Sequence, residues 1–173
     1  MKNSRKKNSK ASLVARCGIA VGLAYVLSNF KLFTMPEGGS VTFVSLPLIL
    51  LSVTSGAPAG AAAGITLGIL KIFTGGKIFG WVQAALDYPL AYSALSFSGL
   101  AMDRGNIPVL LFAFAALILK FLIHLFSGYL FFQKSLYASM IYNAAFSAPE
   151  AAISILALHY ALKKRLIEKI TLN

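Results

Sequence analysis

The sequence is poor in charged residues and especially poor in acids. Charged side chains make up 12% of its 173 residues, and only five residues are Asp or Glu. Soluble domains carry about 25% charged residues, so this composition excludes an ordinary water-soluble protein. Hydrophobic residues make up 58% of the chain and gather in long runs. The composition therefore predicts a membrane protein.

Groups that usually carry metal or covalent chemistry are also scarce. Cys17 is the only cysteine, and the two histidines lie far apart at positions 124 and 159. One cysteine forms no internal disulfide, and no His pair has metal-ligand spacing. The sequence also contains no G-x-S-x-G motif and no Walker loop. We therefore expect no catalytic group, no metal, no cofactor and no ATPase site in this chain.

The net charge of +11 comes mostly from the two ends of the chain. Residues 1–11 and 163–173 are basic tails, and residues 12–162 between them are mainly apolar. Lysine and arginine are enriched in cytoplasmic segments beside membrane spans, where they face anionic lipid. We therefore expect two cytoplasmic tails on one transmembrane domain, with membrane lipid rather than nucleic acid as the partner of the basic residues.

Six apolar segments are separated by breaks that contain Gly and Pro. The segments cover residues 12–29, 41–53, 59–73, 80–100, 108–132 and 137–162. One crossing takes about 20 residues, and six crossings return the C-terminus to the side of the N-terminus, in agreement with the two basic tails. The expected fold is an all-α membrane protein, a bundle of six transmembrane helices with cytoplasmic N- and C-termini. Because the second and third segments are short, four or five crossings stay open.

Three ionisable side chains, Asp87, His124 and Glu150, lie inside apolar segments. Such groups are costly in a membrane and normally face a cavity or a partner. In the six-helix topology they lie roughly 12–18 Å from the outer face, at 1.5 Å per residue. We therefore expect them to share one outward-facing cavity. Structural alternatives stay open: Asp87 could pair with Lys120, the histidine could be packed in the core, and Glu150 could satisfy backbone groups freed by the preceding proline.

Aromatic side chains accompany these polar groups. Tyr88 adjoins Asp87, and Tyr142 lies two turns before Glu150 on the same predicted helix. Aromatic faces combined with carboxylates suit a flat heterocycle that is cationic or carries an amine, through stacking and cation–π attraction. The residues alone therefore favour a small-molecule binding site.

Several stretches of the chain resemble one known family. They are GGSVTFVSLPLILLS (38–52), AGAAAGITLGILKIFTGG (59–76), QAALDYPLAYSALSFSGL (83–100), LKFLIHLFSGYLFF (119–132) and YNAAFSAPEA (142–151). Together they resemble the thiamine-specific substrate-binding subunit of energy-coupling-factor (ECF) transporters. The similarity covers about residues 12–162, and LDYPLA and H-x-x-x-G-x-x-F are its most specific pieces.

This resemblance implies a six-helix bundle in the bacterial cytoplasmic membrane that captures thiamine from outside. It also implies a partner module, made of one transmembrane coupling protein and two ATPases, whose ATP hydrolysis drives release of the vitamin to the cytoplasm. The chain would then be a transporter subunit and not an enzyme.

The resemblance also implies roles for individual residues. The expected substrate-binding residues are Asp87, Tyr88, His124, Phe132, Tyr142, Asn143, Ser147 and Glu150. The expected lid is the first outer loop, with Phe33, Glu37, Gly38 and Gly39. The expected docking residues for the coupling protein are Ala20 and Ala24 on the first helix. Some members carry tryptophan where this chain has Phe132 and asparagine where it has Ser147, and Asn143 lies one turn before Ser147.

Two alternatives to a thiamine-binding subunit stay open. The same architecture could serve another vitamin or precursor, such as hydroxymethylpyrimidine or riboflavin. A membrane protein without a ligand could use the same polar groups only to hold its helices together.

Overall fold

Six helical segments and one short β-hairpin make up the described part of the chain, which comprises residues 9–36, 38–133 and 135–164 of a computed structural model. The separate elements are α1 (Lys10–Asn29), β1 (Phe33–Thr34), β2 (Ser40–Val41), α2 (Ser45–Ser55), α3 (Ala57–Phe73), α6 (Asn106–Phe131) and α7 (Leu136–Lys163). Between α3 and α6, one composite segment runs through α4 (Trp81–Ala85), a π-helical turn η1 (Leu86–Leu90), α5 (Ala91–Ser93) and a 3₁₀-helix η2 (Ala94–Ala101).

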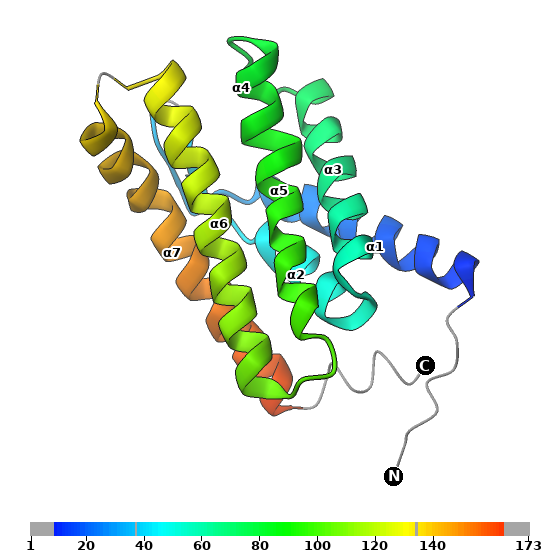
Figure 1. Cartoon of the computed structure of the whole chain (residues 1–173). Coiled ribbons are helices and arrows are strands. Elements are labelled where there is room, and N and C mark those ends of the chain that lie inside the picture. Colours follow the sequence, from blue (N-terminus) through cyan, green and yellow to red (C-terminus); the bar gives the residue numbers. More distant parts are fainter. Residues whose placement is uncertain (1–8, 37, 134, 165–173) are drawn as a thin grey trace.

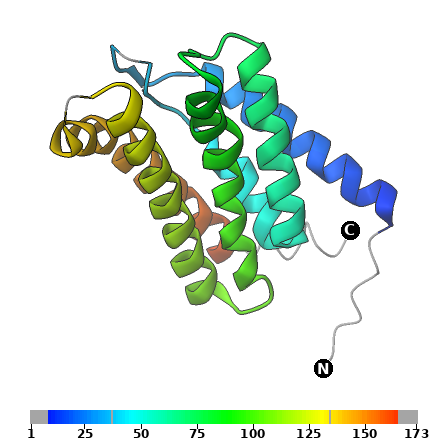
Figure 2. The same ribbon diagram turned by 45° about the horizontal axis from the view of Figure 1, so that its top comes forward.

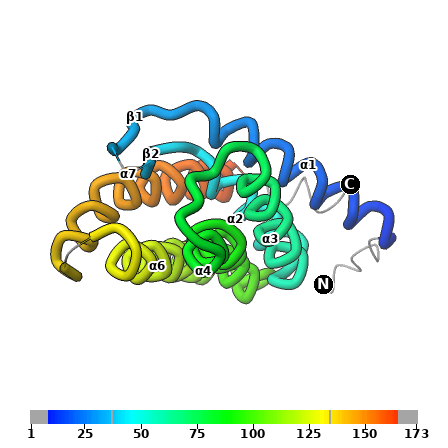
Figure 3. Tube along the Cα trace, turned by 90° about the horizontal axis from the view of Figure 1, so that it is seen from above, coloured from blue at the N-terminus to red at the C-terminus, as the bar shows by residue number. Residues whose placement is uncertain are grey.

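The helices form a bundle in which neighbours in sequence are often neighbours in space. Helices α6 and α7 lie side by side, and the composite segment lies between α6 and α3 (Figure 1). Helix α1 packs on α2 and α3, and the hairpin lies at the end of the bundle where α7 begins (Figure 2). Seen along the bundle, α2 is enclosed by the other helices (Figure 3), and eight of its eleven residues are buried. It therefore forms the centre of the core.

Three of the described helices are long and apolar enough to cross a membrane, namely α1, α6 and α7. Helices α2 and α3 are apolar but shorter, and the composite segment changes helical type three times. Each of the six predicted segments coincides with a helical segment, so the all-α architecture agrees with the sequence. The number of crossings and the side of the termini stay predictions.

Local sequence signals explain where the helices begin. The hydroxyl of Ser9 accepts a hydrogen bond from the Ser12 N–H at 3.1 Å at the start of α1, and Ser135 does the same at the start of α7. Serine is a favoured residue at helix N-termini because it satisfies an N–H that has no partner within the helix. Gly56 separates α2 from α3 with a φ of 91°, a left-handed conformation that glycine adopts without strain.

The predicted loop at 31–40 contains a feature that the sequence analysis missed. Strands β1 and β2 pair antiparallel, with Phe33 opposite Val41 and Thr34 opposite Ser40. Each strand has two residues, which is too short for a pattern of alternating side chains to be recognised in the sequence.

The glycines of α3 allow the close helix contact that was expected from their spacing. A Cβ atom at Gly68 would lie 2.3 Å from the Pro89 Cα, and one at Gly64 would lie 2.6 Å from the carbonyl carbon of Tyr92. Only glycine permits this approach. The contact brings α3 directly against the π-helical turn that carries Asp87.

The two expected docking residues lie in the core. Ala20 and Ala24 are 7% and 0% exposed and pack among residues of α2 and α3. Their side chains therefore do not lie on the surface that a partner would contact. The expectation that these two alanines contact the coupling protein needs correction. The small residues that α1 does expose include Gly18 and Gly22, where an added Cβ would meet nothing within 4 Å.

Candidate functional site

A cavity of about 400 Å³ lies at the end of the bundle where α1 and α3 finish and where α4 and α7 begin. Its lining residues come from α1, the hairpin region, α3, the composite segment, α6 and α7. Sites for small molecules typically have volumes of about 300–1,000 Å³. The cavity therefore has a size suited to a single small ligand.

A π-helical turn carries Asp87 into this cavity. The turn spans Leu86–Leu90 and contains Pro89, which has no N–H to donate to the regular helical hydrogen-bond pattern. Asp87, Tyr88 and Tyr92 all line the cavity. Single π-helical turns occur often at functional sites. Here the turn presents the Asp87 carboxylate and the Tyr88 ring, and α5 directly after it adds Tyr92.

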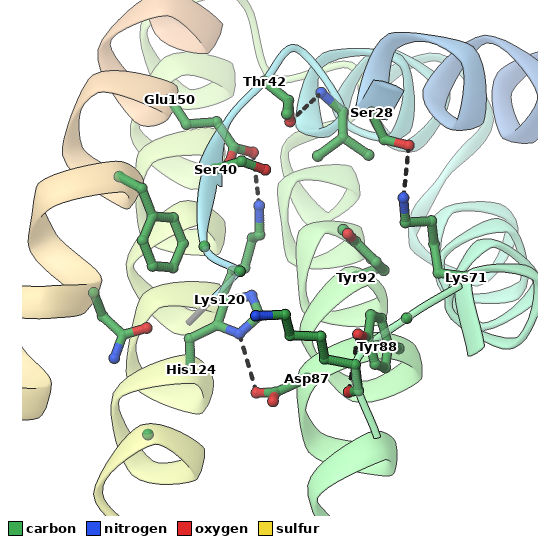
Figure 4. Close-up of a pocket in the computed structure, with 18 of the residues that line it drawn as sticks. Ser28, Ser40, Thr42, Lys71, Asp87, Tyr88, Tyr92, Lys120, His124 and Glu150 are labelled. Atoms are coloured by element: carbon green, nitrogen blue, oxygen red, sulfur yellow. Dashed lines mark hydrogen bonds and ion pairs between the residues drawn. The ribbon is translucent and has the colours of Figure 1, made fainter. Parts of the chain in front are cut away.

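Asp87 is held by two neighbours. Its Oδ1 lies 3.3 Å from Nδ1 of His124 on α6 (Figure 4). Its Oδ2 accepts a hydrogen bond from Nε2 of Gln83 at 2.6 Å. The side chains of His124 and Asp87 are 15% and 17% exposed. The carboxylate is thus mostly buried, fixed in orientation, and still in contact with the cavity.

The second carboxylate, Glu150, is paired with an ammonium group. Lys120 Nζ lies 2.6 Å from Glu150 Oε1 and 2.9 Å from Ser45 Oγ, and the Ser45 hydroxyl also donates to Glu150. Lys120 and Glu150 are 5% and 3% exposed. This network joins α2, α6 and α7 at the cavity wall, and the lysine charge offsets the glutamate charge.

These pairings correct two structural alternatives from the sequence. Lys120 pairs with Glu150 and Asp87 pairs with His124, so the Asp87–Lys120 pair is wrong. Within the described chain, the partners of Glu150 are Lys120 and Ser45 rather than the backbone beside Pro149.

Aromatic rings form another part of the wall. The ring of Phe146 lies 6.1 Å from that of His124 and 6.0 Å from that of Tyr142, in edge-on arrangements at both contacts. Phe132 also lines the cavity, and the edge-on ring of Phe79 lies 4.9 Å away. Edge-on pairs of this kind fix ring positions and leave ring faces for other contacts.

The loop between β1 and β2 lies against the cavity. Gly39 donates its backbone N–H to the Tyr142 hydroxyl at 3.2 Å, and Lys77 Nζ donates to the Pro36 carbonyl at 3.1 Å. Gly38 and Gly39 line the cavity. Of the other expected lid residues, Phe33 is 56% exposed and lies outside the lining, and Glu37 lies outside the described residues.

The structure brings most of the expected binding residues together. The cavity lining contains Asp87, Tyr88, His124, Phe132, Tyr142, Asn143 and Glu150. Ser147 is the exception, because it lies in a separate apolar groove between α6 and α7. Asn143 is 4% exposed, and its side-chain amide donates to the Ser139 carbonyl at 2.9 Å within α7.

Several polar residues of the site were not predicted from the sequence. Lys71 lines the cavity from α3 and donates to the Ser28 hydroxyl at 3.0 Å (Figure 4). Gln83 was also not predicted, and Lys120 was considered only as a partner of Asp87, although each precedes an expected site residue by four positions. Residues four apart lie on the same face of a helix. This spacing, in segments with few polar residues, was the signal that could have identified both.

Comparisons with known proteins found relatives of this chain. The family model described as "Thiamine transporter protein (Thia_YuaJ)" matches residues 14–170. The thiamine transporter ThiT of Bacillus subtilis (strain 168) is 29% identical over 147 residues, which cover 72% of this chain and 76% of that protein. A solved structure of ThiT from Listeria monocytogenes has the same fold, with a TM-score of 0.74 at 21% identity over 90% of this chain and 95% of that one. Because the family model covers most of the sequence, this chain belongs to the thiamine transporter protein family.

Proposed function

We propose that this chain is the membrane subunit that binds thiamine outside the cell and delivers it to the cytoplasm as part of an ECF transporter. The observation that carries the proposal is the single cavity of about 400 Å³ in which Asp87, His124 and Tyr142 meet. Membership of the thiamine transporter protein family supports the choice of ligand.

The two carboxylates of the cavity have different tasks in this proposal. Thiamine contains a positively charged thiazolium ring and an aminopyrimidine ring. Because the Lys120 ammonium lies 2.6 Å from Glu150, that pair contributes little net charge. The partners of Asp87 are an amide and an imidazole. Asp87 is therefore the carboxylate that we assign to the cationic ring, by direct charge attraction.

The other cavity residues suit the ring systems of the ligand. Phe132 and Tyr88 offer ring surface for stacking, and His124 and Tyr142 offer hydrogen-bonding groups. We assign these four to contact with the vitamin. Ser147 is left out of the proposed site, because the groove between α6 and α7 contains it.

The loop at 31–40 is proposed to close over the bound vitamin. Gly39 supports this because its backbone contacts the Tyr142 hydroxyl at 3.2 Å. A Cβ at this position would lie 2.5 Å from the Phe146 ring, so glycine allows the loop to approach the aromatic wall closely.

Transport is proposed to need a partner module of a transmembrane coupling protein and two ATPases, since the sequence has no Walker loop of its own. We place the chain in the bacterial cytoplasmic membrane as six crossings with both basic tails in the cytoplasm. The exposed face of α1 that includes Gly18 and Gly22 is the proposed docking surface, because small residues let another helix approach closely.

Titration calorimetry of the purified, ligand-stripped protein with thiamine in detergent tests the ligand. We expect tight binding at one site per chain, with much weaker competition by hydroxymethylpyrimidine and by riboflavin. Tighter binding of either competitor would assign the cavity to that molecule. No binding of any of the three by a helical protein would favour the structural alternative, in which the polar groups only hold the helices together.

A further inference from the structure

Gln83 uses its whole side-chain amide inside the protein. It lies on α4, four residues before Asp87, and is 1% exposed. Its Oε1 accepts from the backbone N–H of Phe79 at 3.0 Å. Its Nε2 donates to Asp87 Oδ2 at 2.6 Å and to the carbonyl of Lys77 at 3.3 Å. One buried amide thus connects the Asp87 carboxylate to the backbone of residues 77–79.

The direction of this amide follows from its partners. A backbone N–H only donates, so the oxygen of Gln83 must face Phe79. The NH₂ group must then face Asp87 and the Lys77 carbonyl, both of which accept. Every partner has the correct polarity in this orientation, and the flipped amide would place its oxygen against a carboxylate. The contact with Asp87 is therefore a donated hydrogen bond to an acceptor that is normally charged.

We propose that Gln83 is a positioning residue that holds the Asp87 carboxylate in its ligand-binding orientation while leaving its charge intact. The inference rests on the proposed role of Asp87 in binding thiamine. Because Gln83 fixes Oδ2, the other oxygen stays directed toward His124, 3.3 Å away. Gln83 acts through Asp87 and needs no contact with the ligand.

The chemistry of the partner explains why an amide suits this position. The two cavity carboxylates are held by different groups: Glu150 by an ammonium at 2.6 Å, and Asp87 by a neutral amide at the same distance. Both groups supply hydrogen bonds, but only the ammonium cancels the carboxylate charge. A neutral donor orients Asp87 and preserves the negative charge that would attract a cation.

A double-mutant cycle with Gln83→Met and Asp87→Asn tests the proposal by thiamine titration. Methionine has a similar length and removes both hydrogen-bonding groups. Supporting residues around binding groups typically contribute about 10- to 100-fold in affinity, so we expect Gln83→Met to weaken binding by that factor. In the Asp87→Asn background the same change should weaken binding less than about threefold, because residues that act as a unit are not additive. The control is Asn106→Leu, which changes an exposed amide at the start of α6, the end of this helix away from the cavity. It should bind thiamine like the unchanged protein.

Two results would overturn the proposal. The first is a Gln83→Met protein that binds thiamine as tightly as the unchanged protein. The second is an equal loss in both backgrounds, which would mean that Gln83 acts on the structure and not through Asp87. Failure of the unchanged protein to bind thiamine would instead overturn the proposed function. In that case the thermal unfolding midpoints of the same single and double variants, measured without ligand, still decide whether Gln83 and Asp87 are coupled. If the shift of the double variant equalled the sum of the two single shifts, the contact would be contradicted.

Discussion

Replacement of Asp87 by asparagine separates the charge of this residue from its shape. Asparagine has the same size, and its oxygen can still accept the hydrogen bond that Gln83 now donates to Asp87 at 2.6 Å. The π-helical turn and the packing of Gly68 against Pro89 involve backbone atoms and are unaffected. We therefore expect Asp87→Asn to fold normally and to lose only the negative charge facing the cavity.

The size of the effect follows from Coulomb attraction. A cation about 4 Å from the carboxylate gains about 4 kcal/mol at an effective dielectric constant of about 20. The Asp87 side chain is 17% exposed and touches His124, so water and the imidazole screen part of this energy. We expect a net loss of about 2–3 kcal/mol, which corresponds to roughly 30- to 150-fold weaker thiamine binding.

Titration calorimetry in detergent measures this loss directly. Asp103→Asn is the matched control, because Asp103 is the only other aspartate and lies in the exposed turn before α6, outside the cavity. The control should bind thiamine with unchanged affinity. The assignment of Asp87 to the thiazolium charge would be refuted if Asp87→Asn bound as tightly as the control.

Three further changes test the packing and the loop. Lys120→Met leaves Glu150 buried without its ammonium and should destabilise the protein by about 3–5 kcal/mol. Combining Lys120→Met with Glu150→Met should recover much of the unfolding midpoint. A Lys120→Met protein as stable as the unchanged protein would contradict this. Gly68→Ala should lower the unfolding midpoint, because its Cβ would lie 2.3 Å from the backbone of the π-helical turn. Gly22→Ala, which has open space around its Cβ, should leave the midpoint unchanged. Equal midpoints for these two variants would argue against the close contact at Gly68. Tyr142→Phe removes the hydroxyl that accepts the 3.2 Å hydrogen bond from the Gly39 N–H of the loop. Because such a bond contributes about 1 kcal/mol, thiamine release should become about fivefold faster. An unchanged release rate would exclude this bond as a restraint on the loop.

Much of the fold was predictable because apolar length and breakers act locally. The six apolar segments coincide with the six helical segments, and Ser9, Gly56 and Ser135 mark boundaries through local backbone chemistry. The depth of Asp87 and His124 within their segments predicted a shared cavity, since rise per residue in a helix is constant. These features depend on residues close together in the sequence.

Helix rotation was decided only by tertiary packing. Ala20 and Ala24 have the spacing of a docking row, but the rotation of α1 places them in the core and leaves Gly18 and Gly22 exposed. Helices of this chain are apolar on most faces, so the sequence pattern carries little information on which face turns inward. The position of Ser147 in a groove outside the cavity was undetermined for the same reason.

The sequence by itself determined that an apolar helical bundle would contain two carboxylates and a histidine within its segments. Only the tertiary structure decided which partner meets which acid: Lys120 pairs with Glu150, 30 positions away, and His124 meets Asp87, 37 positions away. An ion pair depends on separations of a few ångströms, and those separations are set by how three helices pack together. The chemical character of the cavity, with one carboxylate paired to an ammonium and the other held by an amide and an imidazole, is therefore a property of the folded bundle.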